Sequence, residues 1–238
     1  MKIEVWSDFA CPFCYIGKRR LEQAIEKFPH RDSVEIEFKS FELDPNSPKD
    51  IDMNIHEILS QKYGMSVEQA KQMNANVGKQ ADEVGLTYHF DTMIPTNTFD
   101  AHRLAKYAAD NGLGAQMNER LLKAYFTDSK KISDPNTLAD LAEEIGLHRN
   151  EALTILSGTN FSDSVRADEE EARQLGITGV PFFVLNEKYA ISGAQPVEAF
   201  SNALQMVWDE IKTPLKIINP KKSKSEYCTG EGCEVTEE

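Results

Sequence analysis

The sequence predicts an α/β fold interrupted by a long all-helical insertion, and three observations support this prediction. Residues 2–6 and 34–39 alternate polar and apolar side chains, as half-buried strands do, and a helical pattern lies between them. From about residue 51 to 175 this alternation almost disappears. It returns at 179–185 and, after a short turn, at 188–192, so a single sheet built from both parts of the chain is expected.

The first forty residues predict a strand–helix–strand unit. Pro12 suits the first position of a helix, where a missing N–H costs nothing. Apolar residues with helical spacing run from Phe13 until Pro29 ends the helix. Two strands joined by one helix normally lie parallel, with a right-handed crossover. The proline-containing segment 43–48 then breaks regular structure.

The middle of the chain predicts helices separated by glycine and proline breaks. Ser66 ahead of Gln69, and Asp134 ahead of Pro135, are typical helix starts. A last amphipathic helix is expected at 196–211. The predicted domains are a discontinuous α/β domain, 1–48 and 176–213, a helical insertion, 49–175, and a flexible tail, 214–238. The helices predicted within the insertion are 55–63, 67–84, 99–110, 115–126, 136–145, 149–158 and 162–175.

Composition limits the classes of function. The 26 basic and 39 acidic residues give a net charge of −13, which argues against nucleic acid and anionic membrane surfaces as partners. No apolar run approaches the roughly 20 residues of a membrane helix. Glu4, Asp8 and Cys11 interrupt any signal-peptide core, so a cytoplasmic, reducing location is expected. Four cysteines in two close pairs then indicate redox chemistry or metal binding, not structural disulfides.

Cys11-Pro12-Phe13-Cys14 lies between a predicted strand and a predicted helix. The thiolate is the reactive form, a helix N-terminus stabilises it, and cysteines in such motifs reach pKa values of roughly 3.5 to 7.5. We expect an exposed Cys11 that attacks and a more buried Cys14 that resolves the mixed disulfide. The alternatives are a zinc half-site or two core cysteines. Zinc usually takes four ligands, and no histidine lies near in sequence.

Four blocks of sequence, in this order, resemble the DsbA family of thiol-disulfide oxidoreductases, most closely its FrnE-like branch. In layout they also resemble kappa-class glutathione transferases and 2-hydroxychromene-2-carboxylate isomerases. The resemblance covers residues 1–212 and implies a thioredoxin-like fold with a helical domain inserted after the second strand. It also implies a cis Val180–Pro181 bond, whereas the residues alone would favour trans. The blocks are 8–17, 97–104, 179–184 and 192–196.

The resemblance further implies that Val180 and Pro181 position a substrate beside the sulfurs. Pro12, which restricts the turn, and Phe13, as part of an apolar rim, are expected to help position it. The isomerase and transferase relatives carry serine where Cys11 stands, so two cysteines favour disulfide exchange on protein thiols and disulfides. No metal or organic cofactor is expected, and glutathione or a thioredoxin-type reductant is a further redox partner to consider. A glutathione-dependent isomerase or transferase, and a chaperone-like holdase, remain alternatives. The direction of the redox reaction does not follow from the sequence.

Asp8 and His102 are candidate modulators of the thiols. A carboxylate at Asp8 would raise a nearby thiol pKa or relay the proton of Cys14, although a turn or cap role is favoured. His102 and Arg103 could line a substrate groove on the helix that starts near Phe99. Structural roles are favoured for both of them and for Asn97, because a lone histidine on a helix is weak evidence for a site.

The tail contains a second cysteine pair. Cys228 and Cys233 bracket Thr-Gly-Glu-Gly, and two glycines make that loop flexible enough to close a disulfide. From Pro214 an extended tail reaches roughly 50 Å, whereas a compact chain of this length has a radius of gyration of about 18 Å. FrnE-like relatives carry a tail cysteine pair as well, which supports a second redox pair that exchanges with Cys11. Idle thiols on a disordered tail are the alternative.

Overall fold

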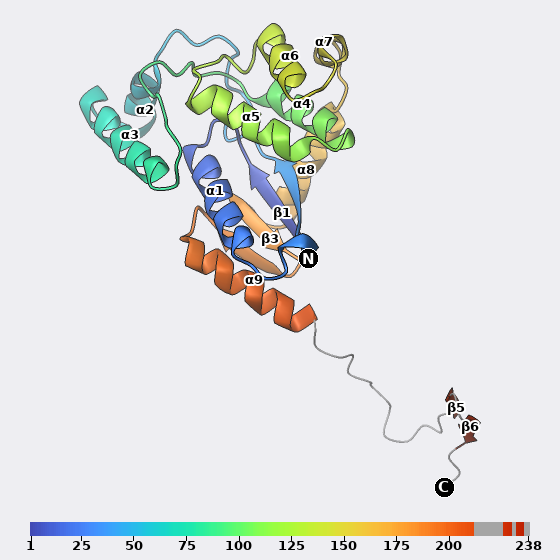
Figure 1. Ribbon diagram of the computed structural model, residues 1–238. Coiled ribbons are helices and arrows are strands. Elements are labelled where there is room, and N and C mark those ends of the chain that lie inside the picture. Colours follow the sequence, from blue (N-terminus) through green and yellow to red (C-terminus); the bar gives the residue numbers. More distant parts are fainter. Residues whose placement is uncertain (212–225, 230–231, 236–238) are drawn as a thin grey trace.

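The computed structural model describes residues 1–211, 226–229 and 232–235, and its main sheet joins both parts of the α/β region (Figure 1). The strand order is β2-β1-β3-β4. β1 is parallel to β2 and antiparallel to β3, and β3 is antiparallel to β4. The strands are β1 (Lys2–Ser7), β2 (Glu35–Ser40), β3 (Phe182–Leu185) and β4 (Tyr189–Ser192). The predicted sheet built from distant segments is therefore confirmed.

One face of the sheet is covered by α1 (Pro12–Glu26) and α9 (Val197–Ile211), which lie side by side (Figure 1). Alternate residues of β1, Ile3 and Val5, point to this face. There they join a core that includes Phe183, Leu21 and Phe200. The amphipathic pattern of the last predicted helix thus buries its apolar side on the sheet.

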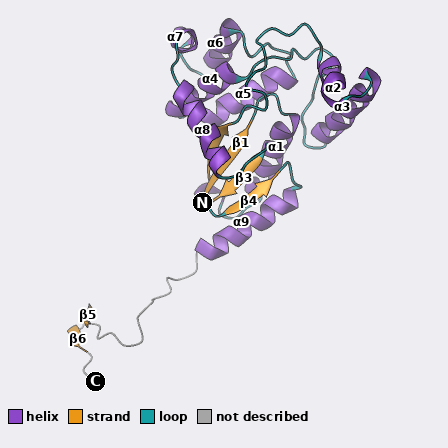
Figure 2. Ribbon diagram, turned by 180° about the vertical axis from the view of Figure 1, so that it is seen from behind, coloured by secondary structure: helices purple, strands orange, loops and turns teal. Residues whose placement is uncertain are grey.

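The opposite face is covered by α8 (Ser162–Gln174), which crosses the sheet in the view from behind (Figure 2). Trp6 of β1 points to this side, packs with Ala172 and Ile177, and donates its indole N–H to the Asp168 carbonyl at 3.1 Å. The last helix predicted for the insertion therefore packs directly against the sheet, whereas the helices before it pack mainly on one another.

All the helices predicted in the middle of the chain are present, with ends that differ by at most a few residues. Ser66 forms the expected capping box with Gln69, and Asp134 accepts the Thr137 N–H. Asn54 forms a second capping box. The largest core lies among these helices and is centred on α4 and α5. They are α2 (Ile55–Tyr63), α3 (Val67–Asp82), α4 (Phe99–Asp110), α5 (Gly114–Phe126), α6 (Pro135–Glu144) and α7 (Arg149–Ser157).

The described part of the tail is a two-stranded antiparallel sheet of β5 (Glu226–Thr229) and β6 (Gly232–Val235). In its register Cys228 pairs directly with Cys233. The linker expected after Pro214 lies outside the described residues. None of the helices in residues 1–211 combines the length and hydropathy that crossing a bilayer requires.

Candidate functional site

The two cysteines lie at the start of α1, as predicted. Cys11 is the N-cap residue in an extended conformation, and Pro12 is the first helical residue. The Cys14 N–H donates to the Cys11 carbonyl at 3.0 Å, and the Cys11 N–H donates to the Asp8 carbonyl at 3.2 Å. Both thiols are free. The strand–turn–helix sequence thus brings two sulfurs onto one turn at the positive end of the helix dipole.

The turn before β3 faces the first sulfur. The Val180–Pro181 bond is cis, which confirms the expectation from the family resemblance. The Cys11 thiol lies 3.6 Å from the Val180 carbonyl and donates to it. Gly17 permits this approach, because a Cβ there would lie 3.0 Å from Pro181 Cγ and 3.2 Å from the Phe183 ring. Gly17 belongs to a resembling block, but its packing role was not predicted.

The burial of Cys11 differs from what the sequence predicted. We expected an exposed attacking thiol, yet Cys11 is only 5% exposed, while Phe13 beside it is 38% exposed. The Val180 carbonyl meets the sulfur on one side, and the walls of an adjoining pocket enclose it on another. Cys14 is buried, as predicted.

That pocket has a volume of about 470 Å³, within the range of small-ligand sites. Cys11, Pro12 and Phe13 form one wall, and the rest comes from α2, α3 and α5 together with the segments 43–51 and 90–98. Its lining is mainly apolar. The charged residues in it are one base, Lys62, and two acids, Asp8 and Asp44. The apolar lining residues include Leu43, Ile51, Ile55, Ile58, Leu59, Met73, Val77, Phe90, Met93, Pro95 and Phe126.

Cys14 faces the interior of the protein. The Asp8 N–H donates to its sulfur at 3.4 Å. Burial raises the pKa of Cys14 well above the ordinary value, and the neighbouring Cys11 raises it further, while the Ser7 hydroxyl opposes the shift. Cys14 is therefore a neutral thiol that must lose its proton before it can act as a nucleophile.

Asp8 plays the predicted turn role and a second role that the sequence did not reveal. Its Oδ2 accepts the Leu43 N–H at 2.8 Å, and its Oδ1 accepts the Ala10 N–H at 3.4 Å. Its Oδ1 also lies 3.3 Å from Nε2 of His102, and both side chains are buried. The two residues are 94 positions apart, so only the fold brings them together.

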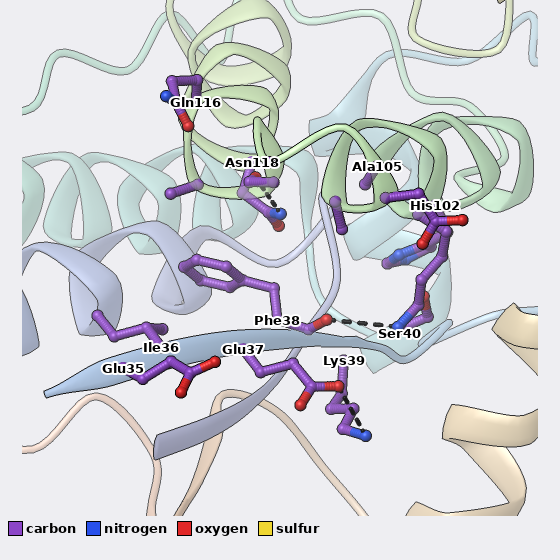
Figure 3. A pocket seen from close by; sticks show the side chains of 16 residues that line it. Glu35, Ile36, Glu37, Phe38, Lys39, Ser40, His102, Ala105, Gln116 and Asn118 are labelled. Atoms are coloured by element: carbon purple, nitrogen blue, oxygen red, sulfur yellow. Dashed lines mark hydrogen bonds and ion pairs between the residues drawn. The ribbon is translucent and has the colours of Figure 1, made fainter. Parts of the chain in front are cut away.

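The favoured structural roles are confirmed for Arg103 of α4 and for Asn97, which precedes this helix. Arg103 is buried and donates to the carbonyls of Ile155 and Gly158. Asn97 accepts the Phe99 N–H at 2.9 Å, just before the helix begins. His102 does not line the pocket beside the cysteines. It lines a separate hollow between β2 and the helices α4 and α5 (Figure 3).

Tyr88 is a contact of the motif that sequence reasoning missed. Its hydroxyl donates to the Pro12 carbonyl at 2.8 Å, and burial raises its pKa above the ordinary value. It thereby ties the first turn of α1 to the segment before α4. No motif around Tyr88 indicates this contact, because it depends on how the helical part packs.

A metal site finds no support in the described part of the chain. No group of three or more histidine, cysteine, aspartate or glutamate side chains in it could hold an ion. The side chains of Cys228 and Cys233, the proposed second redox pair, lie outside what the structure describes.

A family model described as a DSBA-like thioredoxin domain matches residues 2–205. A solved structure titled as a probable DsbA oxidoreductase from Streptomyces coelicolor is 44% identical, with a TM-score of 0.86, and the match covers 100% of both chains. An uncharacterised Bacillus subtilis protein, YwbO, is 28% identical over 204 residues, which are 85% of this chain and 94% of the relative.

Two further solved structures share the fold at lower identity. A 2-hydroxychromene-2-carboxylate isomerase is 16% identical with a TM-score of 0.67, and the match covers 89% of this chain and 98% of the isomerase. The cytosolic disulfide reductase DsbM of Pseudomonas aeruginosa is 16% identical with a TM-score of 0.63. The match covers 88% of this chain and 100% of DsbM. Both support the expected architecture.

Proposed function

The chain belongs to the family of DSBA-like thioredoxin domains, and we propose that it exchanges thiols and disulfides of protein substrates through Cys11 and Cys14. One observation carries the proposal. Two free thiols share the first turn of α1, and the outer one faces the cis Val180–Pro181 turn. Cys11 lies at the positive end of the helix dipole of α1, and the turn offers backbone groups that can align a substrate beside it.

In the reducing direction, the Cys11 thiolate attacks a substrate disulfide. A bond forms between Cys11 and one substrate sulfur, and the other substrate sulfur leaves as a thiolate that takes up a proton. Cys14 then loses its proton and attacks the Cys11 sulfur, which releases the second substrate thiol. The substrate gains two electrons and two protons, and the enzyme keeps a Cys11–Cys14 disulfide. The oxidising direction is the reverse.

The pocket favours an apolar group next to the reacting sulfur. Its walls are mainly apolar. Phe13 lines the pocket and is also partly exposed to solvent. Glutathione carries more negative than positive charge, and the pocket offers it Lys62 opposed by Asp8 and Asp44. An apolar side chain flanking a protein cysteine therefore suits this lining better than glutathione does.

Glutathione or a thioredoxin-type protein remains a proposed redox partner, because a structure of DsbM has been solved with glutathione. We also propose a cytoplasmic location, where a reductant of this kind is available. Cell fractionation combined with thiol trapping tests it. A chain recovered outside the cytoplasm with all its cysteines oxidised would contradict this location.

The tail pair is proposed to exchange with the active site. Directly opposed residues of antiparallel strands have Cα atoms about 4.5–5.5 Å apart, a separation that a disulfide can span. Single-cysteine variants trapped during graded oxidation should yield a mixed disulfide between Cys11 and Cys228 or Cys233. Absence of that species by mass spectrometry would rule out the exchange.

The test of the main proposal measures reduction of insulin disulfides and reoxidation of a reduced protein. The full chain should catalyse at least one of them, and a Cys11→Ser, Cys14→Ser double variant should catalyse neither. Isomerisation of a chromene carboxylate without activity on insulin would instead support the glutathione-dependent isomerase. Full cellular function of the double variant would support a holdase.

A further inference from the structure

The pocket beside Cys11 contains two buried hydroxyl groups that the proposed exchange does not use. Thr98 and Tyr125 line this pocket and are only 5% and 2% exposed. Neither side-chain hydroxyl forms a hydrogen bond within the described part of the chain, and neither oxygen is sealed from the pocket. Buried polar groups are normally paired, and a buried tyrosine hydroxyl usually has a partner. The two hydroxyls therefore indicate a ligand that brings a polar atom of its own.

Thr98 stands where a helix normally uses such a hydroxyl. It is the N-cap residue of α4, and threonine in that position usually accepts an N–H of the first turn. The Thr98 side chain forms no cap hydrogen bond. Asn97 accepts the Phe99 N–H at 2.9 Å instead. The Thr98 hydroxyl is therefore available to a group that enters the pocket.

Tyr125 of α5 places a neutral donor in the same part of the pocket. Burial raises its pKa above the ordinary value, and the nearby Asp8 carboxylate raises it further, so the phenol keeps its proton. Asp8 also lines the pocket, and its Oδ1 lies 3.3 Å from Nε2 of His102. The His102 N–H donates to the Thr98 carbonyl at 3.0 Å. Thr98 and Tyr125 thus both lie around Asp8.

The rest of the lining separates an apolar opening from a buried inner part. Phe13, Leu43 and Tyr63 line the pocket and are exposed, whereas Met93 and Phe126 line it and are buried. The two hydroxyls belong to the buried part. A ligand that fills this pocket therefore needs an apolar body and a hydrogen-bonding group at its inner end.

Among the side chains that can flank a substrate cysteine, tyrosine meets these requirements. It combines an apolar ring with a hydroxyl that both donates and accepts hydrogen bonds. Phenylalanine would fill the same space but leave the hydroxyls of Thr98 and Tyr125 without a partner. An acidic side chain would meet the Asp8 carboxylate, and a charge of either sign would lose its water among apolar walls.

We propose that Thr98 and Tyr125 make the pocket selective for a tyrosine side chain that flanks the reacting cysteine of a protein substrate. The proposal rests on the thiol-disulfide exchange proposed above. Cys11 is itself part of the pocket wall, so a side chain next to the attacked cysteine can enter the pocket while the sulfurs react. The two hydroxyls bind the phenol of the substrate and take no part in the transfer between sulfurs.

Trapped peptides measure this selectivity. The full chain with Cys14→Ser, Cys228→Ser and Cys233→Ser keeps Cys11 as its single cysteine. The Cys11 thiolate attacks one sulfur of a symmetric peptide disulfide and forms a bond to it, and the second peptide leaves as a thiolate that takes up a proton. Without Cys14 the mixed disulfide persists, and mass spectrometry quantifies it.

Paired peptides with capped ends differ only in carrying tyrosine or phenylalanine, one or two positions from the cysteine on either side. Equal amounts of the two disulfides compete for the trapping protein. At one of these positions we expect the tyrosine peptide to be captured at least about tenfold more than the phenylalanine peptide. A general loss of reactivity at Cys11 slows both peptides, so the ratio of the two products reports selectivity alone.

Tyr125→Phe and Thr98→Val, each made in the trapping protein, remove one hydroxyl and nearly keep the shape of the side chain. Each change should lower the ratio by about threefold or more, and the double change should bring it close to one. Tyr107→Phe is the matched control. It removes the hydroxyl of another buried tyrosine, which donates to Glu151 at 2.6 Å and does not line the pocket, so the ratio should be unchanged.

A ratio close to one at every position would overturn the selectivity while leaving thiol exchange intact. A preference for phenylalanine, or a ratio that both hydroxyl variants leave unchanged, would overturn it as well. Failure of every peptide to form a mixed disulfide would contradict the proposed function itself. If a variant unfolds, the unaltered trapping protein decides. There p-cresol should slow peptide capture at a concentration at least about tenfold lower than toluene does, and equal concentrations reject the selectivity.

Discussion

The two cysteine sulfurs of one helical turn have different surroundings. On the pocket side, Cys11 borders a mainly apolar cavity and faces the Val180 carbonyl. On the sheet side, Cys14 contacts the Asp8 N–H and lies next to the buried Asp8–His102 pair. An apolar wall suits capture of a substrate side chain. In the proposed exchange, the two sulfurs of one turn therefore react in different surroundings.

Removing each sulfur should break this comparison most strongly. Cys11→Ser should lower disulfide exchange by about a thousandfold or more, since it removes the thiol that faces the Val180–Pro181 turn. In the Cys14→Ser variant, Cys11 should still attack the substrate, but the mixed disulfide should accumulate because it is not resolved. Mass spectrometry detects this species. Equal accumulation in both variants would show that the two sides are interchangeable.

Packing between α1 and the cis turn gives the next largest effect. Gly17→Ala places a methyl group against Pro181 and Phe183, so it should destabilise the protein by about 1–3 kcal/mol. Gly78→Ala in α3 is the control, because its Cβ would meet nothing closer than 4.0 Å. It should stabilise the helix by about 0.5–1 kcal/mol. Urea unfolding measures both changes, and equal changes would contradict the close approach.

The pH dependence of stability tests whether the Cys14 thiol is as buried as the structure shows. Below pH about 8.5 Cys14 keeps its proton in both folded and unfolded chains. Above that pH the unfolded chain loses the proton, while the folded chain, whose pKa for Cys14 is raised by burial, retains it. Stability of the reduced protein should therefore fall by up to about 1.4 kcal/mol per pH unit until the folded pKa is reached.

Denaturant unfolding of the reduced protein from neutral to alkaline pH checks this expectation. Cys14→Ala is the matched control, because it lacks this titrating group and should lose the corresponding part of the slope. A slope identical in the two proteins would show that Cys14 is not sealed as the structure has it.

The smallest expected effect concerns Tyr88. Tyr88→Phe removes the hydrogen bond to the Pro12 carbonyl and should cost about 0.5–1.5 kcal/mol of stability. Tyr63→Phe, at an exposed site, should stay within about 0.5 kcal/mol of the parent. Thermal melts measure both changes. An effect at Tyr88 no larger than that at Tyr63 would show that the hydrogen bond from Tyr88 to the Pro12 carbonyl does not stabilise the protein.

Local sequence patterns predicted much of this architecture. Alternation identified the strands, and capping residues such as Ser66 and Asp134 placed helix starts, because these signals act over a few residues. The position of Cys11 and Cys14 on one turn followed from their spacing. The cis bond at Pro181 followed from the family resemblance and not from the local residues.

The sequence by itself determined the order of strands and helices and the placement of two thiols at a helix start. Only the tertiary structure decided that Cys11 is buried beside a pocket, that Asp8 pairs with His102, and that Tyr88 holds Pro12. The physical reason is distance along the chain. Periodicity and capping depend on neighbouring residues, whereas burial and proton contacts depend on segments that meet only when separate helices and strands pack together.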